Sequence, residues 1–124
     1  MSITRFRFED LRVYQSALVF VSRVYAIIKI WPPLYKFSLA DQFQRAALSI
    51  PLNIAEGSGR TTKDFQHFLA VARGSCYECI AILSVAKNEK LVSESEYLKV
   101  YEEVGILAKT LTALKSSVSH VPSK

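Results

Sequence analysis

Cys76 and Cys79 have the C-x-x-C spacing that occurs in thiol redox centres and in halves of zinc sites. A zinc site needs two further ligands, but the chain has no other cysteines, and His67 and His120 do not stand at ligand spacing. Both cysteines fall on the apolar side of a predicted helix, where free cysteine packs as a small hydrophobic residue. The pattern therefore favours core packing, and we predict no metal site and no cofactor.

Hydrolytic chemistry would require a nucleophile beside a base, or a pair of carboxylates. Ser49, Ser58 and Ser75 have no histidine partner that the sequence identifies. Glu56 and Glu78 lie on two different predicted helices, where acids pair with arginine more often than they perform acid–base chemistry. We therefore predict no catalytic residue, no small-molecule substrate and a protein that is not an enzyme.

Polar residues recur at steps of three and four on the second predicted helix, and Arg73 and Glu78 are candidates to face them from the third. The combined set comprises Arg45, Ser49, Asn53, Glu56, Arg73 and Glu78. One interpretation is a solvated helix face. The other is that its charged members form ion pairs, either across the hairpin of the two helices or across a subunit boundary, where removal of one partner would leave a buried charge unpaired.

Positive charge is concentrated in the first part of the chain. Residues 1–75 hold ten Lys+Arg and five Asp+Glu, whereas residues 76–124 hold six of each. Arginine matches phosphate groups and base edges well. The candidate nucleic-acid contacts are Arg5, Arg7, Arg12, Arg45, Arg60 and Lys63. Because Phe6 and Phe8 alternate with the first arginines, the alternative is a basic arm that packs its aromatic side chains on the rest of the protein.

An amphipathic helix is predicted over residues 9–31. Its apolar positions recur at steps of three and four, at Leu11, Tyr14, Leu18, Val21, Tyr25 and Ile28. Pro32 and Pro33 follow Trp31 and remove two backbone donors, so we expect the helix to end there.

The second predicted helix, residues 39–57, contains Pro51 in its interior. Apolar spacing continues on both sides of the proline, which predicts one helix with a kink. The alternative is a break at Ser49, because an interior proline costs about 3 kcal/mol unless packing compensates. Gly57 and Gly59 are expected to end the helix through a left-handed cap.

Capping signals precede the other two predicted helices. Thr61 with Asp64 precedes residues 62–88, and Ser93 with Glu96 precedes residues 94–118. No segment alternates with the two-residue period of a strand. Residues 1–124 are therefore predicted to form a single all-α domain, an up-down antiparallel four-helix bundle.

The chain of 124 residues is 50% apolar even without glycine, which is more than a small monomer easily buries. This composition predicts self-association. The longest apolar run, residues 17–31, is interrupted by Arg23 and Lys29, so no membrane helix is expected. The first residues lack the apolar stretch of a signal peptide, which predicts a cytoplasmic protein with reduced thiols.

Three segments resemble a known family. They are FEDLRVYQSA at 8–17, QFQRAALSIPLNIAEGSGR at 42–60 and KDFQHFLAVARGSCYE at 63–78. They are similar to proteins encoded in intervening sequences of bacterial large-subunit ribosomal RNA genes. The matching motif residues are Arg45, Ser49, Pro51, Asn53, Glu56, Gly57, Arg60, Arg73, Gly74, Ser75 and Glu78. The chain departs from the usual pattern at Tyr14, where tryptophan is common, and at Cys76, where an aliphatic residue is common.

The resemblance implies a cytoplasmic basic bundle that forms a homo-oligomer, commonly a pentamer, with RNA binding suspected. A related bundle, the accessory protein of diversity-generating retroelements, is also a basic pentamer and works beside a reverse transcriptase. We therefore expect a non-catalytic oligomeric protein that binds RNA or another nucleic acid through a basic surface, with a reverse-transcriptase-type protein as a further partner. The alternative is a protein-interaction or scaffold assembly that does not bind nucleic acid.

Overall fold

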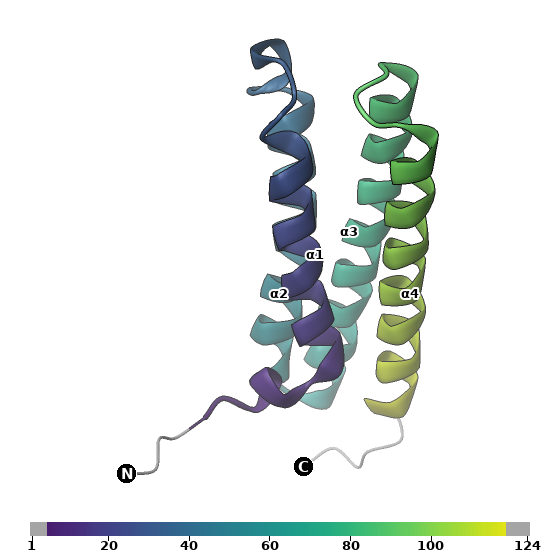
Figure 1. Ribbon diagram of the computed structural model, residues 1–124. Helices are drawn as coiled ribbons and strands as arrows, with labels where there is room; N and C mark the ends of the chain where they lie inside the picture. Colours follow the sequence, from purple (N-terminus) through teal and green to yellow (C-terminus); the bar gives the residue numbers. More distant parts are fainter. Residues whose placement is uncertain (1–4, 119–124) are drawn as a thin grey trace.

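The computed structural model describes residues 5–118, which form four α-helices, two short 3₁₀ helices and no strand. The elements are η1 (Arg7–Asp10), α1 (Arg12–Ile28), η2 (Pro33–Tyr35), α2 (Leu39–Ser58), α3 (Thr62–Asn88) and α4 (Glu94–Val118). The α-helices pack side by side, and consecutive helices run in opposite directions (Figure 1). The prediction of an all-α fold with four helices is confirmed.

The first helix is shorter than predicted at both ends. It begins at Arg12 because Leu11 has an extended backbone, with φ −75° and ψ 125°, and separates α1 from η1. It ends at Ile28, and Lys29 is its C-cap residue. Trp31 already belongs to the connection, because its amide donates to the Ile28 carbonyl over 3.0 Å, three residues back.

The second helix runs through Pro51 without interruption, so the alternative of a break at Ser49 is wrong. Pro51 is buried, and its neighbours Ile50 and Ile54 are fully buried, so packing compensates for the missing backbone donor. The kink at Pro51 stays a prediction.

The two glycines of the α2–α3 connection have roles other than the predicted one. Gly59 has φ −91°, so the expected left-handed cap is wrong. Gly57 is needed for space instead, because a Cβ there would lie 2.6 Å from the Phe68 Cβ. The capping signal after the turn is confirmed, since the Thr61 hydroxyl accepts from the Asp64 amide over 3.2 Å. The second signal is confirmed too, with 3.0 Å between the Ser93 hydroxyl and the Glu96 amide.

All four α-helices contribute to one hydrophobic core. Phe20, Phe43, Leu69 and Leu107, one from each helix, are among its most deeply buried side chains. By length and composition alone, α3 could also cross a membrane, which the sequence analysis did not anticipate. Its apolar side chains are part of this core, however, and core helices commonly pass the same test.

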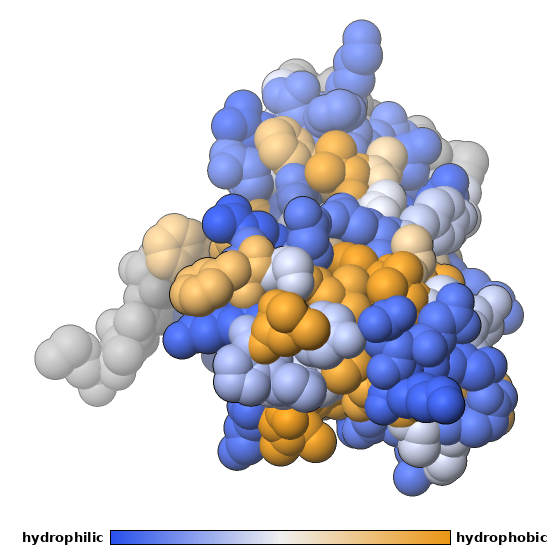
Figure 2. Space-filling model, turned by 90° about the horizontal axis from the view of Figure 1, so that it is seen from above, coloured by the Kyte–Doolittle hydropathy of each residue, from blue (hydrophilic) through white to orange (hydrophobic). Residues whose placement is uncertain are grey.

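The end of the molecule that carries the α1–α2 and α3–α4 connections exposes apolar side chains. The Tyr35 hydroxyl donates to Glu89 over 3.0 Å and joins the two connections. Beside this bond, Leu34 and Phe37 are among the most exposed large apolar residues, Phe37 at 87%. Figure 2 views the molecule from above and shows apolar surface between hydrophilic surfaces. The end that carries the α1–α2 and α3–α4 connections is called the connection end. The opposite end, where η1 and the α2–α3 turn lie, is called the basic end.

Candidate nucleic-acid interface

Five of the six predicted nucleic-acid contacts come together at the basic end. Arg5 precedes η1 and Arg7 begins it, Arg12 begins α1, and Arg60 lies in the turn before α3, whose second residue is Lys63. Figure 1 shows that η1, the start of α1 and the α2–α3 connection share this end. The sixth candidate, Arg45, lies in the first half of α2, nearer the connection end.

Neighbouring acids neutralise half of these candidates. Their partners within the chain are as follows: Arg5 pairs with Asp10 at 3.0 Å, Arg45 with Asp41 at 2.8 Å, and Arg60 with Glu56 at 2.6 Å. The bond to Glu56 raises the pKa of the Arg60 guanidinium, and the guanidinium also lies 5.1 Å from the Phe68 ring centroid. These arginines already have partners, so a phosphate group would have to compete with a carboxylate for each of them.

Arg7, Arg12 and Lys63 are exposed and form no ion pair with any residue of the described range 5–118. Their charges are therefore available to a ligand. Among the six candidates, they are therefore the ones best placed to contact phosphate groups.

The polar set of α2 and α3 does not form the expected ion pairs across the hairpin. Arg45 and Glu56 pair with residues four positions away, and Glu78 is exposed on α3. Arg73 donates to the Thr112 hydroxyl of α4 over 3.1 Å and lies 5.6 Å from the Tyr77 ring centroid. The expectation of charged pairs across this hairpin is therefore wrong within one chain, and the alternative across a subunit boundary stays a prediction.

The hairpin is instead joined by its small polar residues. The Ser75 hydroxyl donates to the Ser49 hydroxyl over 2.8 Å. Asn53 donates to the same hydroxyl and to the Ser49 carbonyl, each over 2.8 Å. This network is partly buried and contains no acid or base, so it serves packing rather than proton transfer.

Both cysteines are fully buried and unpaired. Burial raises the pKa of the Cys76 thiol to about 12, and burial likewise raises the pKa of Cys79. A thiol that stays protonated is a poor nucleophile and a poor metal ligand. Within residues 5–118, no three histidine, cysteine or acidic side chains are grouped so that they could hold a metal ion.

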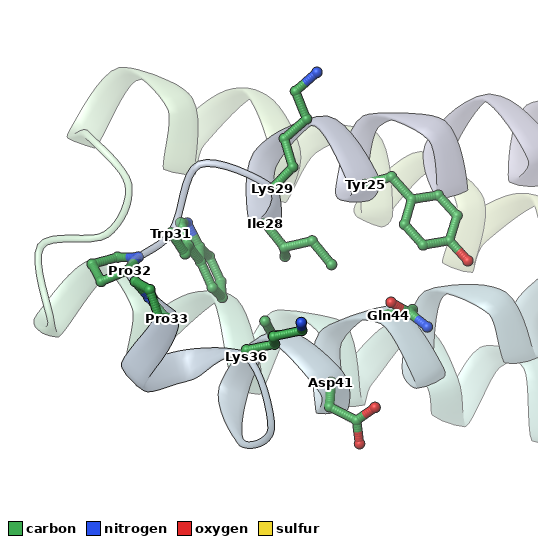
Figure 3. A pocket seen from close by; sticks show the side chains of 10 residues that line it. Tyr25, Ile28, Lys29, Trp31, Pro32, Pro33, Lys36, Asp41 and Gln44 are labelled. Carbon is green, nitrogen blue, oxygen red and sulfur yellow. The ribbon is translucent and has the colours of Figure 1, made fainter.

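A cavity of about 630 Å³, which the sequence patterns did not predict, lies between α1 and α2 at the connection end. Figure 3 shows Tyr25 and Ile28 of α1 on one side and Gln44 of α2 on the other, with Trp31 at one end. The Trp31 indole nitrogen is buried without a hydrogen-bond partner among the described residues. The run Trp31-Pro32-Pro33, which lines this cavity, is its sequence signal, although the two prolines alone predict only a helix stop.

Comparisons with known proteins agree with this fold. A crystal structure described as a protein of unknown function from the S23 ribosomal protein family of Bacteroides thetaiotaomicron is similar, with a TM-score of 0.78 and 22% identity. The similarity covers 84% of this chain and 95% of that one. No curated protein matches the chain. The family model of the 23S rRNA-intervening sequence protein matches residues 9–113, and the chain therefore belongs to that family.

Proposed function

We propose that this chain is a non-catalytic RNA-binding protein of the cytoplasm that acts as a homo-oligomer. The proposal is carried by the basic end, where Arg7, Arg12 and Lys63 are exposed and have no ion-pair partner within residues 5–118. Two further observations support it. The family is described as the 23S rRNA-intervening sequence protein, and the net charge of +5 lies entirely within residues 1–75.

Binding to RNA should depend on salt in proportion to the phosphates contacted. Three phosphate contacts in each protomer give a slope of log K against log[salt] between about −2 and −3. Affinity should then fall roughly 16- to 64-fold between about 50 and 200 mM salt. Fluorescence anisotropy with labelled 23S rRNA fragments measures this, and absence of binding at about 50 mM salt would reject the proposal.

The oligomer is proposed from the apolar side chains that one chain leaves exposed. They include Ile30, Leu34, Phe37, Leu52, Tyr77, Leu98, Tyr101 and Ile106. Several of these are distributed over different helices, as a ring with two interfaces per subunit would require. We propose a pentamer, and native mass spectrometry at micromolar concentration tests it. A stable monomer would contradict the assembly.

A second candidate function is a protein-interaction scaffold. It is favoured by the cavity of about 630 Å³ at the connection end and by the exposed Leu34 and Phe37 beside it. The partner would be a protein such as a reverse transcriptase. Co-purification of a defined partner that persists after nuclease treatment, together with indifference to added RNA, would favour the scaffold over RNA binding.

A further inference from the structure

A row of three aromatic rings leads from α1 to the surface at the basic end. Tyr14 meets Phe8 edge-on, with ring centroids 4.8 Å apart, and Phe8 stacks on Phe6 at 5.8 Å with 30° between the ring planes. Tyr14 and Phe8 are half-buried, whereas Phe6 is 68% exposed. The row therefore ends in a ring that is supported on one side and open to solvent.

Hydrogen bonds hold the backbone that carries this ring. The Phe6 amide donates to the Glu9 carboxylate over 3.1 Å, and the Glu9 amide donates to the Phe6 carbonyl over 3.1 Å. The Gln15 side chain of α1 donates to the Glu9 carbonyl over 2.9 Å. Because the backbone that carries the ring is already ordered, the protein loses little additional conformational freedom when a ligand stacks on the ring.

The charge around the ring is too nearly balanced to attract a polyanion strongly by itself. Among the described residues, the acids at this end are Glu9, Asp10, Glu56 and Asp64, against the cations Arg5, Arg7, Arg12, Arg60, Lys63 and Lys115. The four cations without an ion pair among the described residues, Arg7, Arg12, Lys63 and Lys115, fix only a few phosphates. A further contact that is independent of charge is needed, and the open face of Phe6 is suited to supply it.

We propose that Phe6 stacks on an unpaired base of single-stranded RNA while Arg7 and Arg12 contact the adjoining phosphates. This inference rests on the proposed RNA binding and adds the class of RNA that is bound. A base in a single strand has a free face, whereas the bases inside a duplex are stacked on each other. Because every base offers such a face, this contact carries little sequence preference.

The test compares the full chain with two variants on matched RNAs. The probes are a labelled single strand of mixed sequence and the same strand annealed to its complement. Phe6→Ala should weaken single-strand binding by about five- to 150-fold, the range of base–aromatic stacking. Tyr25→Ala is the control, because Tyr25 is also an exposed aromatic residue but lies in the last part of α1, toward the connection end, and outside the set named for the oligomer. It should bind as the unchanged chain does.

A third variant gives a direct signal of stacking. Phe6→Trp keeps an aromatic plane at this position, so it should retain affinity and its emission should fall when single strands are added. In the unchanged chain the indole of Trp31 is buried near the other end, so its emission should stay constant.

Three results would overturn the inference while leaving RNA binding intact. They are equal affinity for single strands and duplex, Phe6→Ala affinity within twofold of the unchanged chain, and emission of Phe6→Trp that RNA does not alter. A change in native mass of Phe6→Ala would place the ring between copies of the chain and would also overturn it. Binding of neither RNA at about 50 mM salt would reject the proposed function itself.

Discussion

The hydroxyl of Ser75 on α3 donates a hydrogen bond to the hydroxyl of Ser49 on α2, with 2.8 Å between the two oxygens. The bond joins the middle of two long helices through two of the smallest polar side chains. Asn53 completes the network by donating to the same Ser49 hydroxyl over 2.8 Å. Without the Ser75 hydroxyl, the partly buried Ser49 hydroxyl would keep the bond from Asn53 and lose the other one, so the cost is that of one hydrogen bond.

Ser75→Ala should therefore lower the free energy of unfolding by about 0.5–1.5 kcal/mol. Urea unfolding monitored by circular dichroism measures the change. Ser84→Ala is the control, because the Ser84 hydroxyl bonds only to the Ile80 carbonyl of its own helix and should matter less. The double variant, with both Ser49→Ala and Ser75→Ala, should lose less stability than the sum of the losses measured for the two single variants. Simple additivity would contradict coupling between the two hydroxyls.

Gly57 and Gly74 should respond in opposite directions to alanine. A Cβ at Gly57 would lie 2.6 Å from the Phe68 Cβ and 3.0 Å from the Phe65 ring, so Gly57→Ala should destabilise by about 1–3 kcal/mol. A Cβ at Gly74 would meet nothing within 4 Å, and Gly74→Ala should stabilise α3 by about 0.5–1 kcal/mol. Thermal unfolding of both variants checks the pair. A stabilised Gly57→Ala would show that α2 and α3 are further apart at this turn.

The buried cysteines should make stability fall at high pH. Burial raises the pKa of the Cys76 thiol from 9.0 to about 12, and that of Cys79 as well. Between about pH 9 and pH 12 the native chain therefore binds more protons than the unfolded one. Their contribution to the free energy of unfolding is constant below pH 9 and then falls by up to about 1.4 kcal/mol per pH unit for each thiol.

Urea unfolding at pH 8 and at pH 10.5 measures this loss. Cys76→Ala removes one of the two thiols, so its stability should decline less steeply with pH than that of the unchanged chain. Equal declines would show that the Cys76 thiol ionises as readily in the native state as in the unfolded one.

Cations without ion pairs should determine the salt dependence of RNA binding. Arg12→Ala should reduce the magnitude of the slope of log K against log[salt] by about 0.7 on single strands, the value for one phosphate. Arg45→Ala is the matched control, because Arg45 is paired with Asp41 and lies away from the basic end. Its slope should equal that of the unchanged chain. Equal effects of the two substitutions would mean that charge acts without regard to position.

Features set by local physics could be predicted from the sequence. Thr61 and Ser93 cap helices through bonds to residues three positions away, and both bonds are present. The ion pairs of Arg45 with Asp41 and of Arg60 with Glu56 could also have been predicted, since each joins residues four positions apart on one helical face. The prediction placed the partners of Arg45 and Glu56 on another helix or another subunit instead.

Features set by packing between helices could not be predicted in the same way. The contact of Ser49 with Ser75 depends on how α2 and α3 are rotated and shifted against each other. Apolar spacing gives the buried side of each helix but not that shift. The start of the first helix was also misplaced, because the apolar spacing continues through Leu11 although its backbone is extended.

The alternating direction of the four helices has a practical consequence for how the protein can be handled. The start of α1 and the end of α4 lie at the same end as Phe6 (Figure 1). An affinity tag or fluorescent fusion attached beyond either of these helix ends would therefore crowd the surface around Phe6 that is proposed to bind RNA. The turn between α3 and α4, around Lys90, lies at the far end, and it is the better place to attach a dye or tether the protein to a sensor chip.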